Sequence, residues 1–103
     1  MEQSVIAKTE KLDEVVRKFS SELDTYIQSM EVELASLERS LTSLGEGWVM
    51  SDYGVFRQSM EDKMKKIRKE IASSKELKAY LDVTADKFSK LLARLKKAAT
   101  GNQ

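Results

Sequence analysis

The sequence predicts an all-α protein made of two long antiparallel helices that form a helical hairpin. Three of its four glycines lie between Leu44 and Gly54, near the middle of a chain of 103 residues that contains no proline. On each side of this stretch, apolar residues recur every three or four positions, which is the spacing of one helix face. The two apolar stripes also match in register when the chain folds back at the glycines.

The first helix is predicted over residues 4–44. The steps from Tyr26 to Met30 and on to Leu34 are both four residues, which interrupts the alternation of threes and fours typical of a coiled coil. No glycine or proline breaks this segment, so we expect a helix about 60 Å long. Its apolar stripe consists of Val5, Leu12, Val16, Phe19, Leu23, Tyr26, Met30, Leu34, Leu37, Leu41 and Leu44.

The predicted turn begins at Gly45 and ends at Ser51. Gly45 and Gly47 are suited to ending a helix, because glycine adopts left-handed backbone angles without a Cβ clash. Ser51 or Asp52 is the candidate N-cap of the second helix. Trp48, the only tryptophan, has two interpretations that the residues leave open. It is either a structural plug over the end of the two-helix contact or a recognition feature at the bend.

The second helix is predicted over residues 52–98, followed by a frayed tail over residues 99–103. In one antiparallel register, its apolar stripe matches that of the first helix, with a fold axis between Trp48 and Val49. Turn chemistry and stripe register therefore agree. The pairs that face each other in this register include Leu41 with Phe56, Leu37 with Met60, Met30 with Ile67, Val16 with Leu81 and Thr9 with Phe88.

The charges of the two halves are compatible with this pairing. Residues 1–47 contain five Lys and Arg against ten Asp and Glu, whereas residues 48–103 contain thirteen against seven. An acidic helix beside a basic helix gains modestly along its flanks, at about 0 to 1 kcal/mol for each exposed pair. The net charge of the chain is only +1, so the molecule as a whole is not an obvious polyanion binder.

Two helices bury a single row of side chains, and scaffolds of this size often need help from oligomerisation. We therefore expect a homodimer, or a heterodimer with another helical hairpin, that forms a four-helix bundle. The alternative is a monomer whose off-stripe apolar residues are scattered surface residues. The residues predicted to contact the partner are Val15, Ile27, Tyr80, Val83 and Leu91.

Enzyme chemistry is not expected, and no cofactor, metal or small-molecule substrate is implied. The chain has no histidine or cysteine, so Ser73 and Ser74 have no imidazole base and no sulfur or imidazole zinc site exists. The basic cluster Lys63–Lys69 favours a solvated helix face over a nucleic-acid interface. The sequence contains neither a cleavable signal peptide nor an apolar run long enough to span a bilayer.

The stretch Gly47-Trp48-Val49-Met50-Ser51-Asp52, followed by Phe56, resembles the bend of the Trp-x-Gly (WXG) hairpin proteins of bacterial type VII secretion. Met50 stands where that family has glycine, and Tyr80 is followed four residues later by Thr84 instead of an acidic residue. The resemblance implies a secreted substrate, or a targeting partner or chaperone of a larger effector with a helical N-terminal domain. Such a protein is made in the cytoplasm and is exported without a cleavable signal peptide.

A second function remains open at this point. The same helices would suit a cytoplasmic coiled-coil adaptor or scaffold that is unrelated to secretion.

Overall fold

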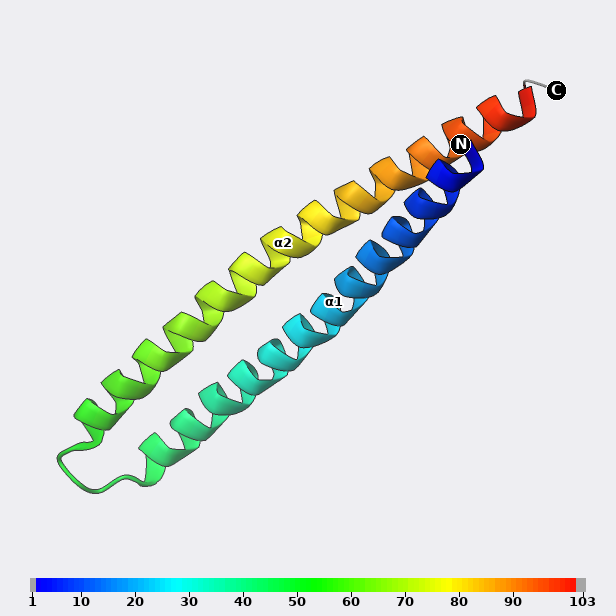
Figure 1. Cartoon of the computed structure of the whole chain (residues 1–103). Coiled ribbons are helices and arrows are strands. Elements are labelled where there is room, and N and C mark those ends of the chain that lie inside the picture. The colour runs from blue at the N-terminus through cyan, green and yellow to red at the C-terminus, as the bar shows by residue number, and fades with distance from the viewer. Residues whose placement is uncertain (1, 102–103) are drawn as a thin grey trace. The chain divides into compact units, whose positions relative to one another are not determined.

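The computed structural model describes residues 2–101, and these form two long α-helices (Figure 1). Helix α1 spans Glu2–Gly47, helix α2 spans Tyr53–Gly101, and residues 48–52 connect them. No strand is present between residues 2 and 101. The predicted all-α fold with two long helices in a hairpin is confirmed.

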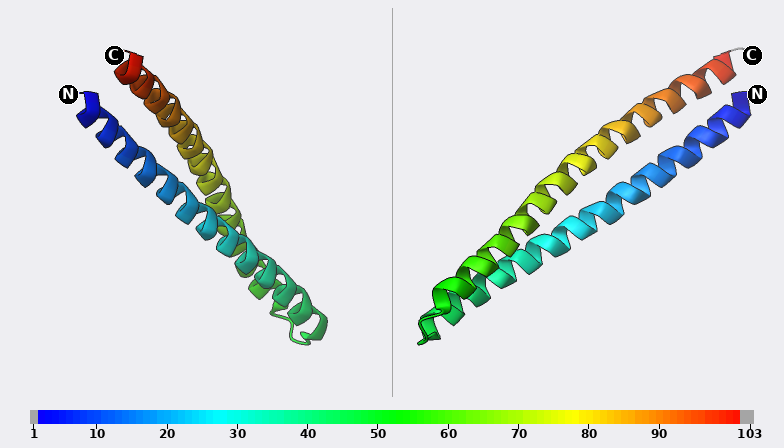
Figure 2. Two further views of the ribbon diagram at one scale, coloured as in Figure 1. Left: turned by 90° about the vertical axis from the view of Figure 1, so that its right-hand side faces the viewer. Right: turned by 60° about the vertical axis from the view of Figure 1, so that its left-hand side comes forward.

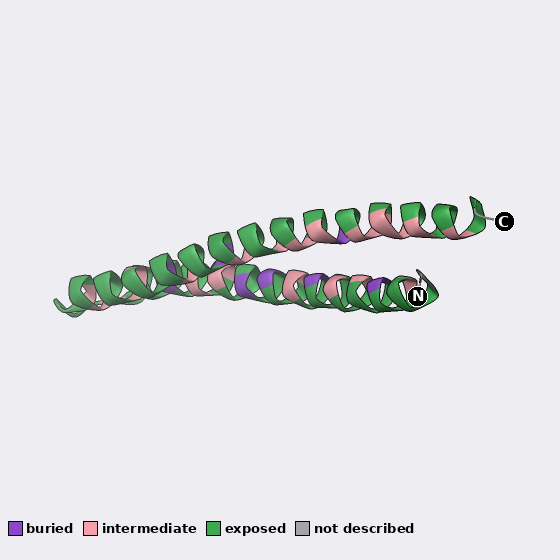
Figure 3. Ribbon diagram, turned by 45° about the horizontal axis from the view of Figure 1, so that its top comes forward, coloured by how far each residue is buried: buried purple, intermediate pink, exposed green. Residues whose placement is uncertain are grey.

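The chain divides into two compact units. Unit 1 combines the chain up to Asp24 with the chain from Glu76 onward, and unit 2 is Thr25–Lys75. In each unit, a segment of α1 lies beside a segment of α2 and runs in the opposite direction (Figures 1 and 2). Buried residues lie on the sides of the two helices that face each other (Figure 3).

Ten of the buried and half-buried positions of α1 form a row that alternates in steps of four and three. We call this row of side chains the seam of α1. Because a constant seven-residue repeat keeps one face of a helix toward its neighbour, the spacing is that of a regular coiled coil. The seam residues, all buried or half-buried, are Thr9, Asp13, Val16, Ser20, Leu23, Ile27, Met30, Leu34, Leu37 and Leu41.

The predicted irregularity at Tyr26 and the predicted partner contact of Ile27 are both wrong. Ile27 is 3% exposed and belongs to the core, whereas Tyr26 is 48% exposed. Taking Ile27 into the seam keeps the seven-residue repeat unbroken, whereas taking Tyr26 would require two consecutive steps of four. The Tyr26 hydroxyl instead donates a hydrogen bond to Glu70 at 2.7 Å on the surface of unit 2.

Other apolar residues that the stripes had placed in the seam are also exposed, and in each case the next residue along the chain is buried or half-buried instead. Ser20 is buried and its neighbour Phe19 is 50% exposed. In α2, Leu77 is exposed while Lys78 is half-buried. Val5 and Leu12 are also exposed. Each helix has enough apolar residues for either of two adjacent faces to be buried. The face that is buried in the structure is the one whose positions keep a regular seven-residue repeat.

The glycines of the predicted turn do not terminate α1 in the expected way. Helix α1 continues through Gly45 and ends at Gly47, and neither residue has a positive φ. Gly45 serves a different purpose, because a Cβ atom at this position would overlap the hydroxyl oxygen of Tyr53. The connection is consequently shorter than predicted and consists of residues 48–52.

The ends of α2 also differ from the prediction. The helix begins at Tyr53, so Asp52 occupies the N-cap position, and its carbonyl oxygen accepts hydrogen bonds from the Val55 and Phe56 amides at 3.2 Å each. At the other end, residues 99–101 of the predicted frayed tail are helical. There Thr100 donates a side-chain hydrogen bond to the Lys96 carbonyl at 3.1 Å. Residues 102–103 of that predicted tail lie outside the described residues.

Candidate functional site

Trp48 is the centre of an aromatic cluster at the bend. Its ring stacks on Phe56 with a centroid distance of 5.3 Å and an interplanar angle of 18°. It also lies 5.6 Å from the Tyr53 ring in a tilted arrangement. The indole Nε1 donates a hydrogen bond to Oδ1 of Asp52 at 3.2 Å. The connection between the helices is therefore held against the first turn of α2 by ring stacking, and a polar contact between Trp48 and Asp52 joins its two ends.

Gly45 brings α1 close to this cluster. The Tyr53 hydroxyl donates a hydrogen bond of 3.4 Å to the Leu41 carbonyl oxygen, one turn before Gly45. The absence of a side chain at Gly45 leaves the space that the Tyr53 ring fills. Three of the four predicted turn residues, Gly45, Trp48 and Asp52, thus contribute to one packed bend, although Gly45 contributes through its missing side chain and not through its backbone angles.

The outer side of the bend is apolar and exposed. Val49 is 96% exposed, and Met50 and Val55 are also exposed. Trp48 itself is half-buried against Tyr53 and Phe56. The stacking supports a structural role of the tryptophan ring, and the exposed neighbours leave a recognition role of the bend as a hypothesis.

Four of the five predicted partner-contact residues lie in unit 1. Val15, Tyr80 and Val83 are exposed, with Tyr80 the most exposed of the three at 68%. Leu91 is half-buried. Ile27, the fifth, belongs to the core of unit 2 as described above, and it cannot contact a partner. Contact with a partner by the other four residues stays a prediction.

Unit 1 carries a second group of apolar residues beside the seam, of which four are exposed and one, Leu91, is half-buried. The apolar stripes had placed all of them in the seam or, for Leu91, also in the partner face. We call this group the apolar flank. The one signal that could have identified it is the unbroken seven-residue repeat through Ile27, which leaves these positions one residue off the seam. The apolar flank consists of Val5, Leu12, Phe19, Leu77 and Leu91.

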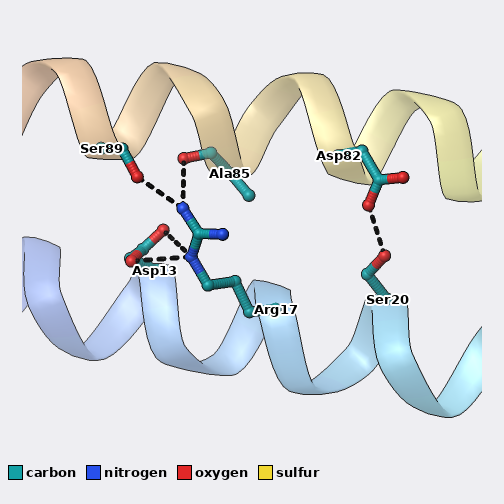
Figure 4. Close-up of polar contacts among 6 residues, drawn as sticks. All are labelled: Asp13, Arg17, Ser20, Asp82, Ala85 and Ser89. Carbon is teal, nitrogen blue, oxygen red and sulfur yellow. Dashed lines mark hydrogen bonds and ion pairs between the residues drawn. The ribbon is translucent and has the colours of Figure 1, made fainter.

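A network of polar contacts lies on another side of the two helices in unit 1 (Figure 4). The Arg17 guanidinium pairs with Asp13 of its own helix at 3.0 Å. It also reaches α2, where it donates hydrogen bonds to the Ala85 carbonyl oxygen and to the Ser89 hydroxyl. One arginine thereby connects the two helices of unit 1 without leaving its own charge uncompensated.

Ser20 makes the second polar connection in unit 1. Its hydroxyl is buried in the seam and donates a hydrogen bond of 2.6 Å to Oδ1 of Asp82. Lys78 donates to the other carboxylate oxygen of Asp82 at 2.8 Å. These bonds, that from Lys78 first and that from Ser20 second, lower the pKa of Asp82 below its ordinary value of 3.8. The bond to Asp82 likewise raises the pKa of Lys78.

The lowered pKa of Asp82 predicts a pH-dependent contribution to stability. A carboxylate whose pKa falls on folding stabilises the folded state above its unfolded pKa, and this contribution is lost as the pH falls through the folded pKa. We expect the wild-type chain to be more stable than the Asp82→Asn variant at pH 6. The difference should shrink as the pH is lowered below about 4. Urea unfolding followed by circular dichroism at several pH values measures it. A difference that is independent of pH would contradict the proposed role of the carboxylate charge.

Unit 2 has its own ion pairs between the helices. Arg68 pairs with Glu38 at 2.7 Å and Lys75 pairs with Glu31 at 3.6 Å. All four side chains are about half exposed, so each pair contributes little to stability. Arg68, Lys66 and Lys69 belong to the basic cluster considered in the sequence, and Arg68 is engaged with an acidic side chain of α1. The pairing of Arg68 is in line with the interpretation of this cluster as a solvated helix face.

The described residues offer few signs of other chemistry. Neither helix, within residues 2–101, has the length and apolar character needed to cross a membrane. In the same range, no three acidic side chains gather in a way that could hold a metal ion. Comparison with protein-family models, curated proteins and solved structures finds no match to this chain.

Proposed function

We propose that this chain is a non-enzymatic helical hairpin of a bacterial type VII secretion system. It acts as a secreted substrate, or as the targeting partner or chaperone of a larger effector, and it does so through helix–helix association. It is made in the cytoplasm and exported without a cleavable signal peptide. The bend residues and the exposed apolar surface of unit 1 support this proposal in different ways.

The bend supports the connection with secretion. The resemblance to the WXG hairpins rests on a lone tryptophan between two long helices. Trp48 lies in the five-residue connection and stacks on Phe56, the aromatic residue that follows in α2. A tryptophan in the middle of either helix would not lie in the connection between them. Its position at the bend is thus compatible with the role that the family resemblance implies.

The single observation that carries the association function is the exposed apolar surface of unit 1. Leu12 and Phe19 are each about half exposed, and Tyr80 is two-thirds exposed. Several large apolar side chains of one unit thus remain in contact with water, and surfaces of that kind mark protein–protein contact sites. A helix–helix partner fits this surface best.

Export from the native host is the experiment that tests this proposal. An epitope-tagged chain is followed in cells and in culture medium, with and without a functional type VII ATPase, and a cytoplasmic protein reports cell lysis. We expect the chain, or an effector that requires it, in the medium only when the ATPase is functional. Trp48→Ala should reduce export, whereas Val32→Ala, at an exposed position of unit 2 away from the bend, should not.

The opposite results would favour the adaptor function. If the chain remains in the cell and no exported protein requires it, the link to secretion is wrong. Equal amounts of chain in the medium with and without the ATPase would also contradict the proposal. Co-purification of the retained chain with a cytoplasmic assembly would then identify it as a coiled-coil scaffold.

A further inference from the structure

A row of buried and half-buried positions in α2 follows the same seven-residue repeat as the seam of α1. We call this row the seam of α2. Both seams pass through unit 1 and unit 2 without a break in the repeat, but the two units differ in the residues that directly precede the seam positions. The seam of α2 consists of Met60, Met64, Ile67, Ile71, Ser74, Lys78, Leu81, Ala85, Phe88, Leu92 and Leu95.

The sequence of unit 2 fixes which face of each helix is buried. In a seven-residue repeat, rotating a helix by about 50° keeps every second seam residue and replaces the others by the residues directly before them. In unit 2 this exchange would bury charged side chains, which is costly without a partner. The seam residues of unit 2 and the residues that would replace them are Ile27 and Tyr26, Leu34 and Glu33, Leu41 and Ser40, Met64 and Lys63, and Ile71 and Glu70.

In unit 1, the same rotation would remove polar residues from the seam and bring in apolar ones. The three incoming residues that change its polarity belong to the apolar flank and are about half exposed in the structure. These exchanges are Leu12 for Asp13, Phe19 for Ser20 and Leu77 for Lys78. The other exchanges are Val5 for Ile6, Thr84 for Ala85 and Leu91 for Leu92. None of the six incoming residues is charged.

The polar contacts of unit 1 show that the apolar flank residues of both helices lie on one side. Arg17 and Ser89, which each follow a seam residue, are hydrogen bonded. Glu10 and Lys96, which also follow seam residues, form an ion pair at 3.2 Å. Because the positions before and after a seam residue lie on opposite sides of the seam, the preceding positions of α1 and α2 lie together on the other side. Rotation of the two helices in opposite senses would bring both sets into one seam.

We propose that unit 1 has a second packing, in which residues of the apolar flank replace the polar residues of the seam. Two contributions oppose each other. The second packing buries Leu12, Phe19 and Leu77, and removing apolar surface from water is favourable. The packing in the structure, which we call the first packing, keeps the hydrogen bonds of Arg17 and Asp82 between the helices. The rotation would break these bonds and return their groups to water.

One irregular step in each helix would join the second packing of unit 1 to the unchanged seam of unit 2. In α1, the steps on either side of Leu23 would both be four residues. In α2, the steps on either side of Ser74 would both be three residues. A coiled coil accommodates such steps by local unwinding or overwinding. They fall where each helix passes from one unit to the other, after Asp24 in α1 and after Lys75 in α2.

The second packing would withdraw part of the exposed apolar surface of unit 1 from water. Leu12 and Phe19 are among the exposed residues that support the proposed association. Unit 1 would thus offer these residues to a partner in the first packing and cover them in the second. This control of association rests on the proposed function, whereas the second packing is a property of the chain alone.

Disulfide trapping within one chain tests the inference, because the chain has no cysteine of its own. Val16 belongs to the seam in both packings. Its neighbour Arg17 hydrogen bonds the Ala85 carbonyl oxygen, which places Val16 and Ala85 at one level of unit 1 (Figure 4). Val16→Cys with Ala85→Cys should therefore report the first packing, and Val16→Cys with Thr84→Cys the second. Neither pair alters a residue whose exchange changes the polarity of the seam.

Arg17→Ala combined with Asp82→Ala should shift the chain toward the second packing. Both side chains hold the first packing, and both positions lie outside the seam in either packing. The rate of cross-linking at Thr84, relative to that at Ala85, should rise about tenfold, the effect of losing one hydrogen bond to a charged group. Non-reducing electrophoresis after oxidation of the dilute chain measures both rates. A rate ratio that the two substitutions leave unchanged would overturn the inference.

A third substitution distinguishes a second packing from a general loosening of unit 1. In the background of Arg17→Ala with Asp82→Ala, Phe19→Ala removes a side chain that only the second packing buries, so it should reverse most of the rise. Tyr80→Ala, which removes an exposed ring outside both seams, should not. A rise that survives Phe19→Ala would mean that unit 1 is only loosened, and the proposed packing would be wrong.

Dye binding measures whether the apolar flank is covered. The chain oxidised at positions 16 and 84 should bind less anilinonaphthalenesulfonate than the chain oxidised at positions 16 and 85. Equal binding would contradict the covering of the flank. All these measurements use the purified chain without any secretion component. A chain that changes its packing but is never exported would reject the proposed function and retain this inference, and an exported chain that keeps the first packing in every variant would do the reverse.

Discussion

Ile27→Ala should lower the free energy of unfolding by about 3 kcal/mol, within the range of roughly 2 to 5 kcal/mol for truncating a buried isoleucine. Ile27 is 3% exposed in the core of unit 2, so its removal leaves a cavity between the helices. Urea unfolding followed by helicity measures the change. All variants are compared at one protein concentration, because association makes apparent stability depend on concentration.

Two variants at exposed positions near Ile27 serve as controls for this result. Val32→Ala removes a β-branched side chain that is 69% exposed, and it should change stability by no more than about 0.5 kcal/mol. Tyr26→Ala should cost less than Ile27→Ala. The opposite order of the Tyr26 and Ile27 variants would mean that Tyr26 occupies the seam and that the observed repeat is wrong.

The second large effect is that alanine substitutions at two glycines of α1 should change the free energy of unfolding in opposite directions. Gly45→Ala should destabilise the chain by roughly 1 to 3 kcal/mol, the usual range for overpacking, because the new Cβ overlaps the Tyr53 hydroxyl. Gly47→Ala meets no atom within 4 Å. It should leave stability unchanged or raise it by up to about 1 kcal/mol, because alanine favours helix over glycine.

Thermal unfolding of the two variants measures this difference. Tyr53→Ala provides the control, since it removes the ring that the Gly45 Cβ would meet. In a Tyr53→Ala background, Gly45→Ala should lose most of its cost. A stabilising effect of Gly45→Ala in the wild-type background would show that the Tyr53 side chain moves away without penalty, and that the packed bend does not depend on Gly45.

Much of the bend was predictable, although Gly45 and Gly47 lie within α1 and do not end it through left-handed backbone angles. Trp48 and Asp52 lie at the connection as predicted, and Asp52 takes the N-cap position of α2. The interaction of the Asp52 side chain with the Trp48 indole was beyond the sequence, because it depends on how the five connecting residues turn. The same is true of Gly45, whose missing side chain matters only because Tyr53 approaches from α2.

The candidate interaction surface was predictable in part. Tyr80 and Val83 were predicted to contact a partner because they fall outside both apolar stripes, and both are exposed. Leu12 and Phe19 were assigned to the seam because an apolar residue in a stripe is normally a core residue. A sequence pattern cannot distinguish a buried apolar residue from an exposed one when both lie within one apolar sector of the helix.

The sequence by itself determined that the chain forms two long helices, that it reverses near Trp48 and that the helices pair antiparallel. These features depend on local properties: the absence of proline, the three-and-four spacing of apolar residues and the placement of glycines. Only the tertiary structure decided which face of each helix is buried. Ser20, Ile27 and Asp82 settle that choice through contacts between segments far apart in the chain. A rotation of α1 by one residue exchanges Tyr26 for Ile27 in the core, and the local pattern is compatible with either.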